Sequence, residues 1–208
     1  MASVITQGEF MYIPKHFKVN DQEEIYEFIK ANSFGQLISI VDGKLFSTHM
    51  PFLLSEDKSS ILGHIAKPNP QHIDLDSQEV LITIQGEHGY ISPSWYENPG
   101  VPTWNYQAVH IYGRCAVFTD AEKLKIVVDN LTRKYEISLP KPWLPDYKSS
   151  KLSGIVGVEI KIRELQCKFK LSQNRSNTDR HQVIKNLHIL GSHKLAEAME
   201  RNGLYQSD

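Results

Sequence analysis

The chain has 208 residues and a mass of 23.8 kDa, with 23 lysines and arginines against 24 aspartates and glutamates. Hydrophobic residues make up 40% of it, which is typical of a soluble globular protein with one domain or one domain plus an appendage. Its two cysteines, Cys115 and Cys167, exclude a disulfide-dense secreted scaffold, and its apolar runs are too short for a membrane-spanning helix. We therefore expect a soluble cytoplasmic protein with no membrane partner.

The first half of the chain predicts a helix followed by hairpin strands. Residues 1–10 precede a second methionine, Met11, and we interpret them as a leader or tag outside the fold. Asn20 and Asp21 can cap a helix, and Asp42-Gly43 is the dipeptide that a type I′ hairpin turn prefers. In chain order, the predicted elements are a helix over 20–31 and strands over 34–41, 44–54, 60–66 and 79–85.

The second half alternates long strands with helices. Residues 90–102 contain three prolines and predict an ordered loop, and Gly191 separates two short helices at the end. In chain order, we expect a strand over 104–118, a helix over 120–135, a surface excursion over 138–149, a strand over 154–171, and helices over 178–190 and 192–201.

This order of elements predicts a mainly β (α+β) fold. Few helices separate the early strands, so a parallel sheet is disfavoured and an antiparallel sheet is expected. Six such strands remove their exposed edges by closing into a barrel. We expect a six-stranded antiparallel barrel with flanking helices and a C-terminal helical appendage.

Charge is distributed unevenly along the chain. Residues 1–160 contain 14 basic and 19 acidic residues, whereas residues 161–201 contain nine basic and four acidic ones. A basic segment of this kind contacts phosphate on a cofactor or nucleic acid, or is simply a solvated surface.

No common catalytic signature occurs, and the histidine spacings do not match zinc ligand pairs, so we assign no catalytic residue and no metal site. Two polar runs at strand ends are more informative. Ser47-Thr48-His49 ends one strand, and the run GHIAKPNPQ at residues 63–71 ends the next. Lys67 offers a positive charge and Asn69 a directed donor for a phosphate, although a strand end before a proline turn has the same composition.

Two later runs combine aromatic and polar side chains. Trp104-Asn105-Tyr106 can wall a flat conjugated ligand, anchor a subunit interface, or serve packing alone. The run KLSQNR at residues 170–175 is either a site or a network that stabilises a turn.

Together these runs resemble the PaiB family, bacterial FMN-binding negative transcriptional regulators of protease synthesis and sporulation. The resemblance extends from Met11 to about Arg201. Its runs are MYIPKHF at 11–17, GHIAKPNPQ at 63–71, YISPSWY at 90–96, VPTWNY at 101–106 and KLSQNR at 170–175. One departure is that Lys67 and Pro68 stand where the family usually has Arg and Ala. Lysine keeps the charge but loses the bidentate fork of arginine.

The resemblance implies a split barrel over residues 11–175, of the kind shared with pyridoxamine phosphate oxidases and flavin reductases. Residues 176–208 would form a helical extension packed on it. It also implies a homodimer with FMN at the interface. The implied cofactor-binding residues are Ser47, Thr48 and His49 on the isoalloxazine, His64, Lys67 and Asn69 toward the phosphate, Trp104, Asn105 and Tyr106 completing the pocket, and Ser172, Asn174 and Arg175 nearby.

The function implied is that of a dimeric negative transcriptional regulator in the cytoplasm, with promoter DNA as a partner. No helix-turn-helix is evident, and the terminal helices favour a packing role over a DNA-binding one. One alternative is an FMN-dependent oxidoreductase, a flavin reductase or an oxidase resembling pyridoxamine phosphate oxidase, with His49 or His64 as proton donor. Two others are a haem-handling split-barrel protein and a ligand-binding module without catalysis.

Overall fold

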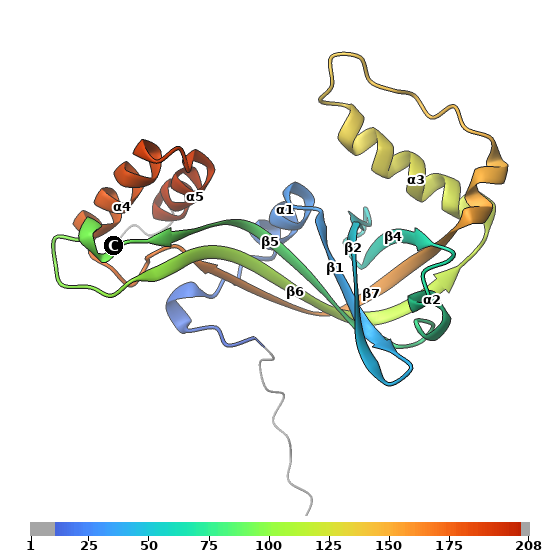
Figure 1. The fold of residues 1–208 in the computed structure, drawn as a ribbon, viewed down its shortest axis with the longest axis horizontal. Helices are drawn as coiled ribbons and strands as arrows, with labels where there is room; N and C mark the ends of the chain where they lie inside the picture. Colours follow the sequence, from blue (N-terminus) through green and yellow to red (C-terminus); the bar gives the residue numbers. More distant parts are fainter. Residues whose placement is uncertain (1–10, 205–208) are drawn as a thin grey trace, which may run out of the picture. The chain divides into compact units, whose positions relative to one another are not determined.

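The computed structural model of the chain describes residues 11–204; the predicted leader at residues 1–10 lies outside the described residues. The elements in chain order are η1 (Lys15–Phe17), α1 (Gln22–Ala31), β1 (Phe34–Val41), β2 (Lys44–Pro51), β3 (Leu53–Leu54), β4 (Ser60–Ala66), α2 (Gln71–Asp74), β5 (Glu79–Ile91), η2 (Pro93–Trp95), β6 (Thr103–Phe118), α3 (Ala121–Glu136), η3 (Ser149–Gly154), β7 (Ile155–Lys170), α4 (Asn177–Ile189) and α5 (His193–Leu204) (Figure 1). Among the described residues, no helix is both long and apolar enough to cross a membrane.

The strands form one sheet in the order β2-β1-β5-β6-β7-β4-β3. The pairings of β1 with β2 and β5, and of β4 with β3 and β7, are all antiparallel. The predicted hairpin between β1 and β2 is confirmed: Asp42 and Gly43 have φ of 47° and 73°, the left-handed conformations that a type I′ turn needs. The predicted antiparallel fold class is therefore confirmed.

The sheet has seven strands rather than the predicted six, because the segment predicted as one strand over 44–54 is interrupted. Phe52 is only 1% exposed, and its backbone N–H donates to the Ser33 carbonyl oxygen at 2.6 Å. Ser33 immediately precedes β1 and stands opposite Phe52 in the β1–β2 register, so this bond extends that pairing by one residue. Leu53 and Leu54 then pair with β4 instead. The segment therefore divides at Phe52 because it changes its pairing partner from β1 to β4, which a period-two pattern cannot predict.

Strand β5 runs six residues beyond its predicted end at Gln85, to Ile91. Its last part contains Gly86 and Gly89 and lacks the alternation of a typical strand. Helix α5 covers this part: a Cβ at Gly89 would lie 2.9 Å from a methyl group of Leu195. Tertiary packing therefore stabilises a segment with weak intrinsic strand propensity.

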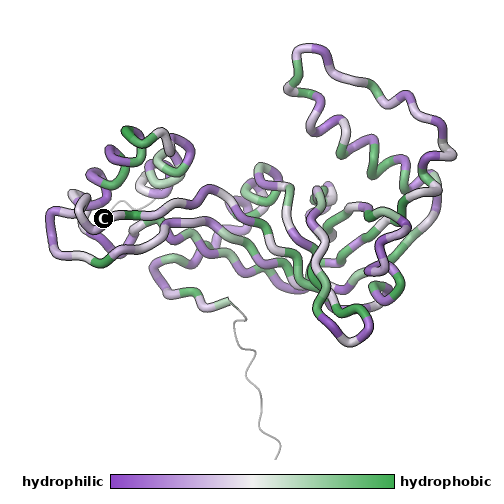
Figure 2. Tube along the Cα trace, viewed as in Figure 1, coloured by the Kyte–Doolittle hydropathy of each residue, from purple (hydrophilic) through white to green (hydrophobic). Residues whose placement is uncertain are grey.

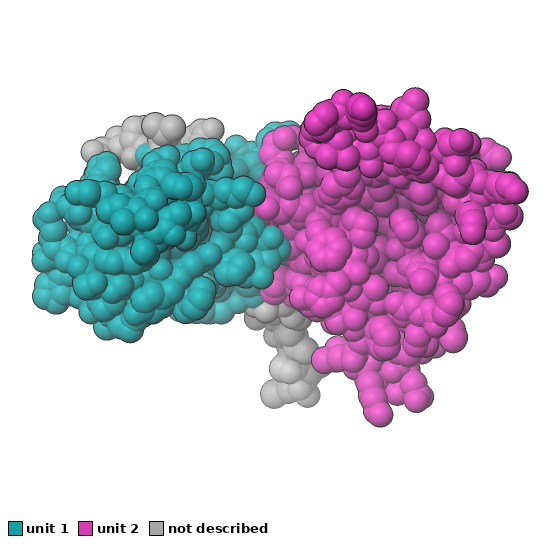
Figure 3. All heavy atoms as spheres, turned by 45° about the horizontal axis from the view of Figure 1, so that its top comes forward, with its two compact units in different colours: residues 1–25, 85–109, 166–208 teal, residues 26–84, 110–165 magenta. Residues whose placement is uncertain are grey.

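The chain divides into two compact units (Figure 3). Among the described residues, unit 1 comprises residues 11–25, 85–109 and 166–204, and unit 2 comprises Tyr26–Ile84 and His110–Leu165. The strands β5, β6 and β7 contribute residues to both units. The boundary predicted at residue 175 lies inside unit 1 and stays a prediction.

In unit 2 the sheet curls back on itself. Strands β2 and β4 are far apart in the ladder order, yet a Cβ at Gly63 of β4 would lie 2.4 Å from Met50 Cε and 3.2 Å from the Pro51 carbonyl oxygen of β2. Glycine at position 63 leaves room for the Met50 side chain, which a larger residue would have to displace.

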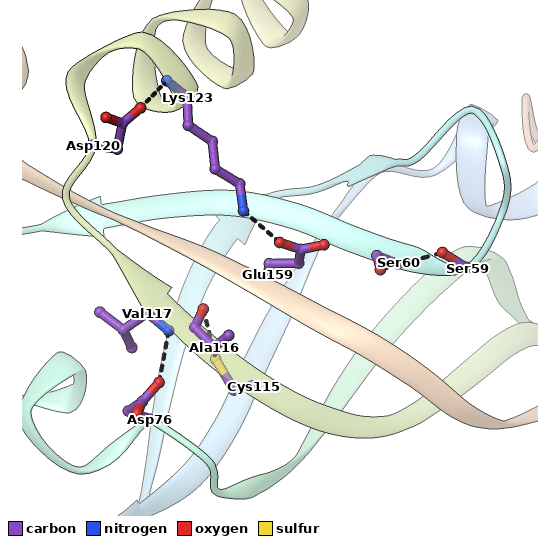
Figure 4. A network of polar contacts seen from close by, with 9 residues as sticks. All are labelled: Ser59, Ser60, Asp76, Cys115, Ala116, Val117, Asp120, Lys123 and Glu159. Atoms are coloured by element: carbon purple, nitrogen blue, oxygen red, sulfur yellow. Dashed lines mark hydrogen bonds and ion pairs between the residues drawn. The ribbon is translucent and has the colours of Figure 1, made fainter.

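Helix α3 is fixed to unit 2 at its first turn. The Asp120 side chain caps the helix by accepting a 2.8 Å hydrogen bond from the Lys123 backbone N–H, and Lys123 Nζ lies 2.6 Å from Glu159 Oε2 on β7 (Figure 4). Hydrophobic and hydrophilic residues alternate along the helix (Figure 2), and its apolar residues Leu124, Val127 and Leu131 are buried.

Both cysteines are buried free thiols, each 2% exposed. Burial raises the pKa of the Cys115 thiol to about 12, with a smaller contribution from the charge of Asp76. Burial also raises the pKa of the Cys167 thiol, with a smaller contribution from the charge of Glu24. Because only the thiolate is nucleophilic, we expect neither thiol of the native protein to react with Ellman's reagent at about pH 8. Both should react once guanidinium chloride unfolds the chain. Fast reaction of one thiol in the native protein would contradict this.

Candidate functional site

The sequence-predicted site residues fall into two groups, one in each unit. Unit 2 holds Ser47, Thr48 and His49 on β2, His64 on β4, and Lys67 and Asn69 in the turn before α2. Unit 1 holds Trp104, Asn105 and Tyr106 on β6, and Ser172, Asn174 and Arg175 after β7. Within residues 11–204, no three histidine, cysteine, aspartate or glutamate side chains converge as a metal site requires.

The β2 residues of unit 2 are divided between the two faces of their strand. Ser47 and His49 are exposed, and Ser47 Oγ donates to Gln36 Oε1 on the paired strand β1 at 3.2 Å. Thr48 lies between them and points to the opposite face, because successive strand residues alternate.

The turn after β4 is fixed by a chain of amide hydrogen bonds. Asn69 Nδ2 donates to Thr48 Oγ1 at 2.8 Å, so the structure brings these two predicted residues together. Asn69 Oδ1 accepts from the Gln71 backbone N–H at 3.0 Å. Gln71 is fully buried, and its Nε2 donates to the Leu37 carbonyl oxygen and to Ser39 Oγ at 3.1 and 2.9 Å.

Lys67 stands at the start of this turn with its ammonium group available. Its backbone N–H donates to the Gly154 carbonyl oxygen at 2.8 Å, which holds the main chain in place. The side chain is exposed and has no acceptor among the described residues. A fixed backbone with a free cation at its surface suits an anionic group.

His64 carries an unsatisfied polar atom. It lies opposite Gly157 of β7, and its Nδ1 is buried without a hydrogen-bond partner among the described residues. Burial lowers the pKa of the imidazole below its usual value. An unpaired buried nitrogen is costly, so this position suits a ligand or a bound water that supplies the missing partner.

Acid should destabilise the fold through this histidine. A lowered pKa in the folded state means that the unfolded chain binds the proton more readily, so the stability is present above the unfolded pKa of about 6.5 and is lost as the pH falls below it. We expect the urea concentration at the midpoint of unfolding to be lower at pH 5 than at about pH 7.5. This difference should be smaller in His64→Gln. His110 shifts in the same direction for the same reason, so a residual slope is expected. The control, His181→Gln at an exposed position on α4, should retain the wild-type slope; equal slopes in all three proteins would contradict the role of His64.

In unit 1, each residue of the run Trp104-Asn105-Tyr106 has different surroundings. The Trp104 ring is 54% exposed and meets Tyr90 edge to face, with centroids 6.2 Å apart. Asn105 is fully buried, and the Tyr106 ring centroid lies 5.4 Å from Lys168 Nζ.

Asn105 and Ser172 form an internal pair. Asn105 Nδ2 donates to Ser172 Oγ at 2.9 Å, and Ser172 Oγ lies 3.2 Å from Asn105 Oδ1. Asn105 Nδ2 also contacts Met199 Sδ of α5 at 3.3 Å. Both residues therefore join β6, the end of β7 and α5; their contact with a cofactor stays a prediction.

A cavity of about 140 Å³ lies in unit 1 beside this pair. Of the predicted residues, Ser172, Asn174 and Arg175 line it, whereas Trp104, Asn105 and Tyr106 do not. Its other lining residues are Phe17, Tyr96, Val101, Thr103 and Lys170. The prediction missed Tyr96 and Lys170 as site residues, although both belong to polar and aromatic runs that stand out in the sequence.

Comparison with known proteins identifies the family. Residues 11–164 match the family described as "Putative FMN-binding domain". The chain is 44% identical over 188 residues to "Protease synthase and sporulation protein PAI 2" of Bacillus subtilis, covering 85% of this chain and 89% of that protein.

Two solved structures share the fold at low sequence identity. The flavocytochrome Anf3 from Azotobacter vinelandii aligns with a TM-score of 0.63 at 17% identity, over 82% of this chain and 78% of that one. The FAD and heme binding protein from Mycobacterium smegmatis aligns with a TM-score of 0.63 at 11% identity, over 78% of each chain. These likenesses support the predicted split-barrel fold class. With the family match and the Bacillus relative, they lead to one conclusion: the chain belongs to the PaiB family of FMN-binding-domain proteins, whose cofactor is a flavin.

Proposed function

We propose that this protein is a flavin-binding negative regulator of transcription that acts on protease and sporulation genes. The observation that carries the proposal is the 44% identity to the Bacillus subtilis protein, which extends over 85% of this chain and 89% of that one. A relationship over nearly the whole length of both proteins supports a shared role more strongly than a shared fold does.

The donors of unit 2 fit the phosphorylated side chain of FMN. The Lys67 ammonium group is exposed and has no acceptor in the part of the chain that the structure describes, and Asn69 is held near it by Thr48 and Gln71. His64 Nδ1 is buried and without a partner among residues 11–204. In this proposal Lys67 and Asn69 bind the phosphate, His64 supplies a hydrogen bond, and Ser47 and His49 lie toward the ring. The flavin, when bound, supplies redox chemistry or a redox signal.

The proposed regulator is a homodimer with its flavin pocket at the dimer interface. Large apolar side chains are exposed on the paired strands β1 and β2, where Phe34 is 60%, Ile40 50% and Leu45 81% exposed. Exposed apolar residues grouped on one strand pair support association with a second copy of the chain. Sedimentation of the purified protein measures the dimer directly.

Retention of promoter DNA tests the regulatory proposal. Purified protein, with and without added FMN, is titrated onto fragments upstream of protease and sporulation genes of the source organism, with scrambled fragments of equal length as controls. We expect the promoter fragments to be retained at salt concentrations that release the scrambled ones, because non-specific phosphate contacts weaken steeply with salt. If both sets of fragments are retained equally and the protein steadily oxidises NAD(P)H in the presence of FMN, the regulatory role is rejected. The protein would then be assigned as a flavin-dependent oxidoreductase.

A further inference from the structure

The cavity of unit 1 has the size of a small ligand and not of a dinucleotide or a whole flavin. Its volume is about 140 Å³. Pockets that enclose drug-sized molecules measure roughly 300–1,000 Å³, whereas a cavity of about 150 Å³ holds a molecule such as benzene. Four of its lining residues also lie beyond residue 164, where the match to the FMN-binding domain ends: Lys170, Ser172, Asn174 and Arg175.

The lining of the cavity is cationic without a compensating acid. Lys170 and Arg175 are its charged residues, and neither has a carboxylate partner among the described residues. Lys170 Nζ donates to Thr103 Oγ1 at 2.5 Å and to the Trp104 carbonyl oxygen at 2.6 Å, so it is fixed at the cavity wall. Burial, followed by the charges of Lys168 and Arg175, lowers the pKa of Lys170. An anion in the cavity would relieve this repulsion.

Tyr96 and Arg175 form a stacked pair with unused donors. The Arg175 guanidinium carbon lies 4.3 Å from the centroid of the Tyr96 ring, and this half-buried guanidinium has no acceptor within residues 11–204. The Tyr96 hydroxyl is buried and likewise has no partner there. Stacking orients the planar guanidinium, so its N–H groups are preorganised for an oxyanion.

The backbone at the cavity adopts a conformation that local sequence does not favour. Ser172 is buried and left-handed, with φ of 65°, and its hydroxyl is held by Asn105. Non-glycine residues in this region cost free energy and persist where the surrounding structure enforces them, commonly at functional sites. Here the turn carries the chain from β7 to Asn174 and Arg175 at the cavity wall.

We propose that this cavity is a second ligand site, separate from the flavin, which binds a small oxyanion such as inorganic phosphate or a compact carboxylate. Arg175 and Lys170 supply the positive charge, Asn174 donates a hydrogen bond, and the Tyr96 ring orients Arg175. Phe17 and Val101 provide an apolar wall for a small organic group attached to the anion. Such a site gives the protein an effector input that is independent of its flavin.

The proposal is tested by calorimetric titration of the full-length protein, first with inorganic phosphate and separately with benzoate. Sodium chloride keeps the ionic strength constant in both titrations. We expect saturable binding of at least one probe below about 10 mM. Arg175→Gln should weaken it about tenfold or more, as loss of a charged hydrogen bond predicts. Tyr96→Phe keeps the ring that orients Arg175 and should leave the affinity within about twofold. Arg163→Gln is the matched control, because it removes the same charge from β7 at an exposed position outside the cavity.

Tyr96→Phe also guards against a folding artefact. It removes a buried hydroxyl that has no partner, so its thermal midpoint should not fall below that of the wild type. Three results would overturn the proposal: no saturable binding of either probe, equal weakening by Arg175→Gln and Arg163→Gln, or competition between phosphate and FMN with loss of FMN affinity in Arg175→Gln. The last result would make the cavity part of the flavin site. Failure of FMN to bind at all would reject the flavin site without affecting this test.

Discussion

Replacing Lys67 with alanine is expected to weaken FMN binding about tenfold or more while leaving riboflavin binding within about twofold. Riboflavin lacks the phosphate, so the two ligands differ in the group that Lys67 is proposed to contact. The Lys67 side chain has no acceptor among the described residues, and its backbone is held by Gly154, so its removal should not disturb the fold. Flavin fluorescence titration at fixed ionic strength measures both affinities.

Two further variants sharpen this experiment. Lys44→Ala removes another exposed lysine, at the start of β2, and should change neither affinity. Lys67→Arg keeps the positive charge and should strengthen FMN binding, because a guanidinium contacts a phosphate through two parallel hydrogen bonds. Equal weakening of FMN and riboflavin in Lys67→Ala would show that Lys67 does not contact the phosphate.

Replacing Asn105 with leucine is expected to lower the free energy of unfolding by about 1–3 kcal/mol. The substitution removes the amide that bonds Ser172 Oγ, so the hydroxyl of a residue that is only 3% exposed loses its partner. Urea unfolding monitored by circular dichroism measures the loss.

The double variant Asn105→Leu/Ser172→Gly separates the lost hydrogen bond from simple packing changes. Glycine accepts the left-handed backbone at position 172 and removes the orphaned hydroxyl. The double variant should therefore lose less free energy of unfolding than the sum of the losses in the two single variants. Asn177→Ala, at an exposed position on α4, should stay within about 0.5 kcal/mol of the wild type. A wild-type midpoint for Asn105→Leu would reject the structural role and leave Asn105 available to a ligand.

The sequence determined the features that depend on neighbouring residues. Asp42 and Gly43 tolerate the left-handed backbone of a tight turn, so the hairpin of β1 and β2 was predictable from the dipeptide alone. The Asp120 cap of α3 and its apolar stripe were equally local, because capping and helical periodicity act within one or two turns. The polar runs at strand ends also marked the two groups of candidate residues.

Only the tertiary structure decided how those residues are used. The segment over 44–54 divides at Phe52 because it changes its pairing partner from β1 to β4, and β5 extends to Ile91 because α5 packs on it. Asn105 is a buried partner of Ser172, 67 residues away in sequence, whereas its neighbour Trp104 is exposed. Contacts of this kind join segments whose separation along the chain carries no signal of their proximity. The cavity formed by Tyr96, Lys170 and Arg175 therefore arises from packing, although each of its residues is visible in the sequence.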